Sequence, residues 1–146
     1  MTEHLISQGH EKIALLCSYK EDVSIGALRL TGYKKALEAH NIPVDERRIR
    51  HMDPELDSYS MESGYRMTKA LLEEGVDCTA IFAISDSLAI GAVRALIDAG
   101  KEYRWIFLWQ VLTEQKWQLI IILPLRQYGS QQKQWQEKLS NFFLTA

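Results

Sequence analysis

Cysteine, long apolar runs and excess positive charge are all scarce in this sequence of 146 residues. The two cysteines, Cys17 and Cys78, lack CxxC or Cys/His spacing, so we expect two small buried side chains and no metal or redox pair. No apolar stretch approaches the roughly 20 residues that cross a bilayer, and residues 1–12 lack the features of a signal peptide. A cytoplasmic protein with no membrane contact is expected. The net charge of -2 supplies no basic surface for nucleic acid.

Motifs for catalysis and for nucleotide binding are also missing. The sequence contains no GxGxxG, no GxxxxGK[ST] and no GxSxG. Asp53, Glu55 and Asp57 are spaced like a calcium loop, but Pro54 and the lack of a distal glutamate argue against one. The histidines have no mutual spacing for a metal and are expected at surface or structural positions: His4, His10, His40 and His51. We therefore expect a protein that is not an enzyme and holds no cofactor or metal.

The first hundred residues alternate between short apolar runs and helical patterns. Strands are predicted at 12–17, around 48–52 and at 78–85, and helices at 22–40, from 58 to a stop at Gly75, and from 86 to a stop at Gly100. The helix at 22–40 has one apolar stripe: Ile25, Leu28, Leu30, Tyr33 and Leu37. This order predicts an α/β fold, a three-layer α/β/α arrangement around a parallel sheet with right-handed crossovers.

Ligands of such folds bind at the carboxyl ends of the strands, where loops lead into helices. The loops at that edge are "CSYKEDVS", "HMDPELDSYS" and "AISDS", all rich in hydroxyls and carboxylates. A binding site for a polar small molecule is therefore expected there.

Four stretches of the sequence, in this order, resemble the LacI/GalR family of bacterial transcription regulators. They are "TEHLISQGHEKIALL", "RLTGYKKALEAHNI", "SGYRMTKALLEEG" and "TAIFAISDSLAIGAVRALIDAGK", and the resemblance spans residues 2–101. It implies a sugar-sensing core of two similar lobes, like a periplasmic binding protein, joined to an N-terminal helix-turn-helix in a homodimer. Closure of the lobes on a sugar or sugar phosphate would then alter operator binding.

This chain looks like the second lobe of that core. The helix-turn-helix, the hinge helix and most of the first lobe are expected upstream of Met1, so operator DNA would be contacted only through that absent domain. The alternative is a periplasmic-type sugar-binding receptor, which shares the architecture. The missing signal peptide and the regulator-like motifs argue against it.

The resemblance assigns effector contacts to four residues. Arg29 matches an arginine whose guanidinium forks onto sugar hydroxyls, and Tyr59 matches an aromatic that stacks on the sugar. Ser85 matches a position that hydrogen-bonds a hydroxyl, and Asp86 is the acid beside it. Each has a second interpretation: a surface helix charge for Arg29, packing for Tyr59, and a plain helix cap for Ser85 and Asp86.

The composition changes abruptly after Lys101. All four tryptophans lie beyond it, no aspartate does, and glutamine occurs eight times after it against once before. The family pattern would continue here with a strand ending in "GFDG", then "TTIRQP" and a last helix, and none of these is present.

A shift of the reading frame by one nucleotide explains the change. If each true codon joins the last base of one codon to the first two of the next, "WQVLTE" at 109–114 can encode "VAGFDG". In the same way "IIILPLRQYGSQ" at 120–131 can encode "YYHPSITTIRQP", and the final "QKQWQEKLSNFFLTA" can encode "AETMAGKAVEFLFDS". The hypothesis divides the chain into a sugar-sensing lobe at 1–101 and an out-of-frame tail at 102–146.

The rival interpretation is a divergent tail with an aromatic interface. In either case "RWIFLWQVL" favours a strand that could take the place of the lost one, and "QWQEKLSNFFLT" favours a short helix.

Overall fold

The computed structural model describes residues 1–56, 59–100, 105–109 and 118–122, the last two ranges by their backbone. Helices are α1 (Thr2–Ser7), α2 (Ile25–Ala39), α3 (Met61–Glu73) and α4 (Asp86–Asp98), and a 3₁₀ turn covers Glu46–Arg48. Strands are β1 (Ile13–Cys17), β2 (Ile49–His51), β3 (Ala80–Ala83), β4 (Trp105–Trp109) and β5 (Gln118–Ile122). The predicted alternation of strands and helices is confirmed, and α1 is an addition to it.

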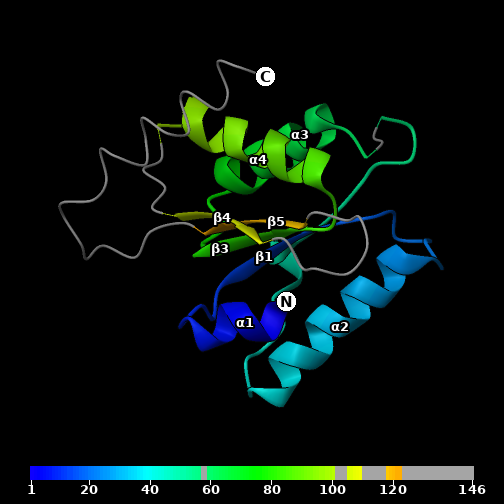
Figure 1. Cartoon of the computed structure of the whole chain (residues 1–146). Coiled ribbons are helices and arrows are strands. Elements are labelled where there is room, and N and C mark those ends of the chain that lie inside the picture. Colours follow the sequence, from blue (N-terminus) through cyan, green and yellow to red (C-terminus); the bar gives the residue numbers. More distant parts are fainter. Residues whose placement is uncertain (57–58, 101–104, 110–117, 123–146) are drawn as a thin grey trace.

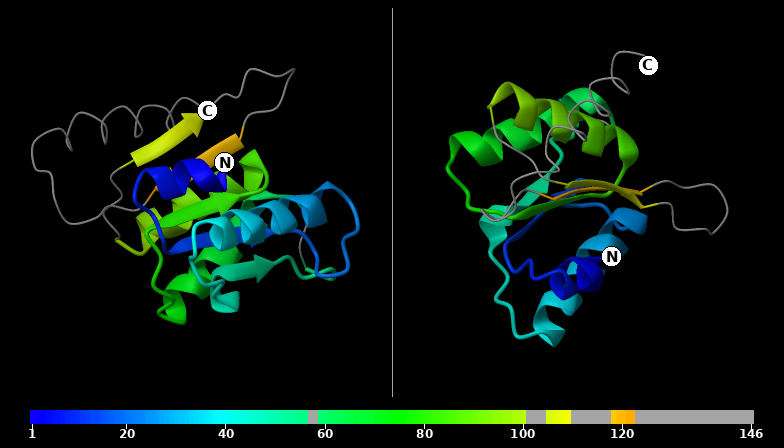
Figure 2. Two further views of the ribbon diagram at one scale, coloured as in Figure 1. Left: turned by 90° about the horizontal axis from the view of Figure 1, so that it is seen from below. Right: turned by 60° about the vertical axis from the view of Figure 1, so that its left-hand side comes forward.

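Three layers form the molecule, as the sequence predicts. Helices α1 and α2 cover one face of the sheet and α3 and α4 cover the other (Figure 1), and the right-hand view of Figure 2 shows the same separation. The sheet order is β2-β1-β3-β5-β4, and β1 pairs in parallel with both β2 and β3. Every residue of β1 and β3 is buried, because helices cover both faces of these strands.

A strand, β4, is present within the segment "RWIFLWQVL", as predicted. The place beside β3 is occupied by β5, which runs antiparallel to β3, and β4 lies at the edge, paired antiparallel with β5. The backbone groups at the edge of β3 accept a partner in either direction, so an apolar strand of either direction can extend the sheet. The helix predicted for "QWQEKLSNFFLT" lies outside the described residues.

The three long helices begin and end with the same kinds of capping residue. Each begins at a serine whose side chain accepts a backbone N–H of the first turn: Ser24, Ser60 and Ser85. Each is followed by a residue in the left-handed conformation, Asn41, Gly75 and Gly100 with φ of 56°, 65° and 61°. The predicted stops at Gly75 and Gly100 are therefore confirmed.

The predicted apolar stripe of α2 is only half right. Tyr33 and Leu37 are buried in the core, and Tyr33 Oη donates a hydrogen bond of 2.8 Å to the Ile13 carbonyl. Ile25 and Leu28, by contrast, are 58% and 71% exposed. The first turns of α2 extend past the end of the sheet, so these side chains have no core to contact.

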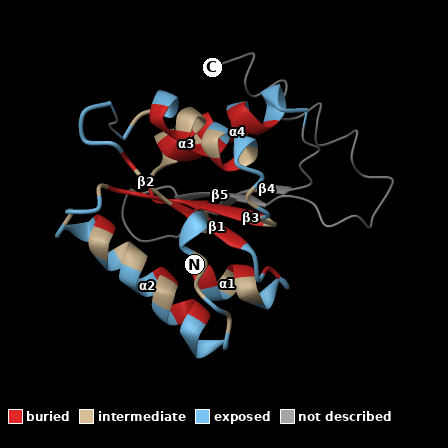
Figure 3. Cartoon of the chain, turned by 180° about the vertical axis from the view of Figure 1, so that it is seen from behind, coloured by how far each residue is buried: buried red, intermediate tan, exposed pale blue. Residues whose placement is uncertain are grey.

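Burial follows the layers. Figure 3 shows the buried faces of the helices turned toward the sheet and their exposed faces turned outward. Cys17 is buried and Cys78 is half-buried, and both are free thiols. In the part of the chain that the structure describes, no helix is long and apolar enough to cross a membrane.

Candidate functional site at the carboxyl edge of the sheet

The carboxyl ends of β1, β2 and β3 meet at one edge of the sheet, as the parallel pairing requires. Two hydrogen bonds connect these strand ends with the residues that follow them. His51 Nδ1 donates to the Ser18 carbonyl over 2.9 Å, and the Ile84 amide donates to the Leu16 carbonyl over 3.2 Å. The carboxyl ends of the three strands are therefore linked at this edge.

Arg29 lies on the second turn of α2 and reaches across this edge. Its Nη1 donates a hydrogen bond of 2.5 Å to the carbonyl of Ile84, the residue that follows β3. This bond holds the guanidinium at Ile84, the residue that precedes Ser85. The other N–H groups of the guanidinium remain available to a ligand. The surface-charge interpretation does not describe this contact, because Arg29 is half-buried and connects α2 to the loop before α4.

Tyr59 belongs to the same surface, at the entry to α3. Its side chain is 46% exposed. Partial burial raises the pKa of its hydroxyl, the Asp22 charge raises it further, and the Ser18 hydroxyl and the Arg29 charge act in the opposite direction. The charges of Asp22 and Arg29 therefore act on Tyr59 in opposite directions, and part of its side chain is open to solvent.

Ser85 and Asp86 form the start of α4. The Ser85 hydroxyl oxygen accepts the Leu88 amide over 3.3 Å, so Ser85 is the N-cap of this helix. Asp86 is the acidic residue of the first turn, where a carboxylate favourably meets the positive end of the helix dipole. Both are half-buried. The capping role is thus present, and the Ser85 hydroxyl keeps its own proton to donate to a ligand.

Ser18 and Asp22 are members of this surface that the sequence analysis did not select. Asp22 Oδ1 accepts the Ser24 amide over 2.7 Å, and its carboxylate and the Ser18 hydroxyl both pack against Gly26. The Ser18 hydroxyl, and then Ser24, lower the pKa of Asp22. The spacing of an aspartate two residues before a helix-capping serine was a local signal for this turn, but the approach of Ser18 depends on the fold.

An exposed apolar rim surrounds these polar groups. Seven large apolar side chains are exposed in the described part of the chain, and all but Ile97 lie in the loops and helix starts at this edge. The rim consists of Val23, Ile25, Leu28, Leu56, Tyr59 and Met61. Such an apolar concentration at one edge is typical of a surface that another structure covers.

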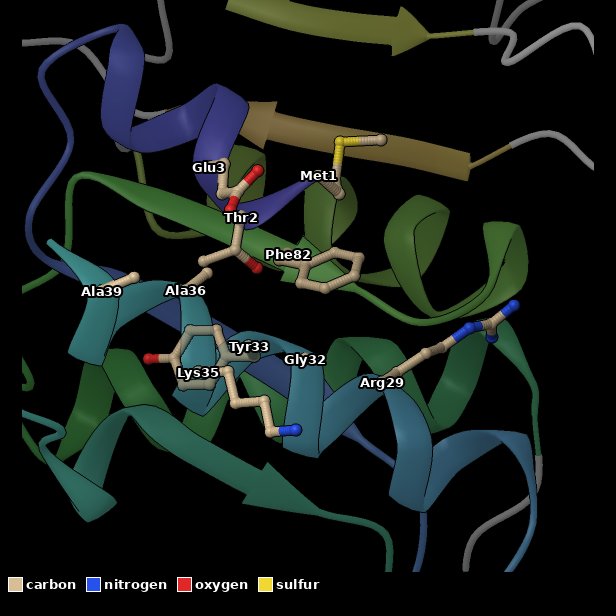
Figure 4. Close-up of a pocket in the computed structure, with 10 residues that line it drawn as sticks. All are labelled: Met1, Thr2, Glu3, Arg29, Gly32, Tyr33, Lys35, Ala36, Ala39 and Phe82. Atoms are coloured by element: carbon tan, nitrogen blue, oxygen red, sulfur yellow. The ribbon is translucent and has the colours of Figure 1, made fainter.

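A cavity elsewhere in the molecule is not this site. It has a volume of 470 Å³ and lies between α1 and α2, with Thr2, Tyr33, Ala36 and Phe82 in its lining. Figure 4 shows Arg29 at its end, with the guanidinium extended away from the other lining side chains. Among the described residues, no group of three or more His, Cys, Asp or Glu side chains is arranged to hold a metal ion.

One family model matches most of the described residues. The model of the periplasmic binding protein-like domain matches residues 2–102, more than half of the chain. The chain belongs to this family, and within it to the part that LacI/GalR transcription regulators use as an effector-binding lobe.

Individual relatives are transcription regulators. The chain is 37% identical over 99 residues to the lactose operon repressor of Escherichia coli K12, which covers 67% of this chain and 25% of the repressor. A sugar-binding LacI-family regulator from Escherichia coli, solved with phosphate, matches with 35% identity and a TM-score of 0.60, over 67% of this chain and 33% of that one. The regulator CelR, solved with cellobiose, matches with 32% identity and a TM-score of 0.61, over 70% and 29%.

These matches cover only part of each relative. The chain spans about a quarter of the length of the curated relative and about a third of each solved chain. The relatives are regulators and not receptors, which favours the first of the two predicted functions over the periplasmic-type receptor.

Proposed function

We propose that this chain forms one wall of the effector cleft of a LacI-type transcription regulator, with a sugar or sugar phosphate as effector. The observation that carries the proposal is the hydrogen bond from Arg29 to the Ile84 carbonyl. It brings a guanidinium from α2 to the start of α4, directly before Ser85 and Asp86. Planar donors, an aromatic face and carboxylates are the groups that recognise sugar hydroxyls and ring faces.

Each of the four residues has a distinct role in the proposed site. The free N–H groups of Arg29 donate to hydroxyl oxygens, while its bond to Ile84 fixes their direction. Tyr59 offers the open part of its ring to the apolar face of the effector. Ser85 donates its hydroxyl proton, since its oxygen already caps α4, and Asp86 accepts from an effector hydroxyl.

The partners of the whole regulator follow from the same proposal. The apolar rim at the carboxyl edge faces a second lobe, and the effector lies between the two walls. Closure of the cleft changes the affinity for operator DNA, whose contacts are made by residues other than those described here, in a cytoplasmic homodimer. This wall alone is expected to bind an effector weakly, because pockets of this kind enclose most of the ligand.

A second part of the proposal concerns residues 102–146, which we infer to be translated out of frame. Two independent observations support it. The family model matches only as far as residue 102, and the tryptophan, glutamine and aspartate contents change at the same point. In this proposal, the aromatic residues after Lys101 are not a binding site.

A titration of this chain with neutral and phosphorylated sugars tests effector binding. We expect weak, saturable shifts of the backbone amide NMR signals of Arg29, Tyr59, Ser85 and Asp86. The variant Arg29→Lys keeps the charge but loses the guanidinium fork, and we expect about a tenfold loss of affinity, or about 1.4 kcal/mol. Arg94→Lys, on the outer face of α4, is the matched control and should bind like the parent chain. Equal affinities of the parent chain and Arg29→Lys would contradict the assignment.

A further inference from the structure

The proposed function leaves open whether the effector is charged. The N–H donors and the charges at the helix N-termini of the carboxyl edge bear on this question. Because α2, α3 and α4 each follow a parallel strand, their N-termini all lie at this edge. Helix N-termini attract anions, since their first N–H groups are unpaired and the helix dipole is positive there. A phosphorylated effector would normally be bound through such a helix start.

Each of these three helix starts is already supplied with its own acceptor. The Ser24 oxygen accepts the Gly26 amide over 3.5 Å, Ser60 accepts the Ser63 amide over 3.2 Å, and Ser85 accepts the Leu88 amide over 3.3 Å. The donors that a phosphate needs are therefore partly occupied from within the chain.

Each helix start also has its own carboxylate. Asp22 lies two residues before the N-cap of α2 and accepts the Ser24 amide over 2.7 Å. Glu62 lies in the first turn of α3, and Asp86 lies in the first turn of α4. A carboxylate at this position compensates the helix dipole and repels a second anion.

Negative charges outnumber positive charges among the described residues of this edge. Six carboxylates belong to its described loops and first turns: Glu21, Asp22, Asp53, Glu55, Glu62 and Asp86. The cations of the same surface are Lys20, Arg29 and Arg66, an excess of three negative charges. Of these cations, Arg29 and Arg66 each donate one hydrogen bond to a backbone carbonyl, to Ile84 over 2.5 Å and to Leu56 over 2.9 Å, and both keep their positive charge.

From these observations we infer that the effector is uncharged: a polyhydroxyl compound, such as an unmodified sugar, and not a sugar phosphate or a sugar acid. The inference rests on the proposed function, because it assigns the chemical class of ligand for the same wall. Carboxylates accept hydrogen bonds from hydroxyl groups without any charge conflict, whereas a phosphate dianion would meet them as a like charge.

Matched pairs of ligands test this inference on the full chain. The probes are D-glucose, D-galactose and D-ribose, each with its terminal phosphate ester, titrated into ¹⁵N-labelled protein. For at least one pair, we expect the neutral sugar to shift the amides near Arg29, Tyr59 and Ser85, with its ester binding at least about tenfold more weakly. The difference should shrink in 1 M salt, where the screening length falls to roughly 3 Å.

A double variant separates charge from structure. Asp22→Asn with Glu62→Gln removes two negative charges, while the amide oxygen of the introduced asparagine can still accept the Ser24 amide. We expect the affinity ratio of ester to neutral sugar to rise by threefold or more. Glu38→Gln removes a charge at the opposite end of α2 and should leave the ratio unchanged.

The outcomes distinguish the two proposals. Binding of an ester as tightly as or more tightly than its neutral sugar would overturn the inference and leave the cleft-wall function standing. A neutral preference that the double variant does not alter would also overturn it, because the carboxylates would then not cause the preference. If no sugar of either kind shifts the amides at this edge, the proposed function fails and the inference fails with it.

Discussion

His10 connects the first helix to the central sheet through one ring. Its side chain is 6% exposed, and Nδ1 shares a hydrogen bond of 3.0 Å with the Thr79 hydroxyl. The Thr79 amide in turn donates to the Lys12 carbonyl over 2.7 Å, at the points where β1 and β3 begin. The imidazole therefore links the segment after α1 to the residue before β3, and the Thr79 amide extends this link to the residue before β1.

Burial lowers the pKa of His10 below its ordinary value of 6.5, which gives the first prediction. The unfolded chain then binds a proton more readily than the folded one, so the stabilising contribution is complete above pH 6.5 and is lost as the pH falls through the lower, folded pKa. We expect the free energy of unfolding, measured in urea, to decrease between pH 7.5 and pH 5.5.

The variant His10→Gln serves as the control for this prediction. It retains a polar side chain without the titration, so its stability should vary less over the same interval, whatever its absolute value. An equal pH dependence in both proteins would show that groups other than His10 cause the effect. Carboxylates titrate mainly below this range, so their contribution to it should be small.

Site residues could be selected from the sequence when their position in an element decides their place. The loop that holds Ser85 and Asp86 is selected in this way, because a strand followed at once by a helix leaves it at the carboxyl edge, whereas the assignment of these two residues as effector contacts came from the family resemblance. The Arg29 contact with Ile84 and the packing of Ser18 beside Asp22 could not be predicted from spacing. They join residues from separate elements, whose approach is set by how α2 packs on the sheet.

At the scale of elements, α3 and α4 approach each other closely where they cross. Gly64 on α3 lies against the Leu88 carbonyl, and Gly91 on α4 lies against the Met61 carbonyl. A Cβ at either position would overlap these backbone atoms, which cannot rotate away as a side chain can. The two glycines therefore set the distance between the helices.

This contact predicts opposite effects of the same substitution on different helices. Gly64→Ala and Gly91→Ala should each lower the free energy of unfolding by about 1–3 kcal/mol or more, because the helices must separate. Gly32→Ala on α2 is the matched control, since nothing lies within 4 Å of its added Cβ. It should raise stability by up to about 1 kcal/mol through helix propensity. Urea unfolding of the three variants measures both signs, and equal effects would contradict the packing argument.

The helices and the buried strands followed from the sequence because local patterns specify them. Serine caps, left-handed stops and continuous apolar runs each act within a few residues. The exposure of Ile25 and Leu28 did not follow, since it depends on how far the sheet extends beneath α2. The direction of β5 is a similar case, because an apolar strand pairs with β3 in either orientation.

At the scale of the whole molecule, the frame hypothesis gives a prediction at the level of the gene. Sequencing across the codon for Lys101 should reveal a shifted frame that encodes "GFDG" at 111–114 and "TTIRQP" at 126–131. A nucleotide sequence without these signatures would refute the hypothesis and favour a divergent tail.

A protein with the frame restored extends this prediction to stability. Residues selected for this fold should bury their apolar side chains better than an unselected segment, so the melting temperature is expected to rise by several degrees. A restored protein that melts at or below the temperature of the present chain would contradict the expected gain. The chain ending at Gly100 is the control, because it lacks both versions of the tail.

The described core has a consequence for how this protein is made. Its buried apolar residues extend from Leu5 to Leu96, and both glycines of the α3 and α4 crossing lie within this span. During synthesis the N-terminal part of a chain emerges and begins to fold first. The ribosome thus completes the three parallel strands and their four helices before it reaches the codon after Lys101. Under the proposal that the reading frame shifts after Lys101, the codons for this buried core all precede the shift, so we expect the core to be translated unchanged.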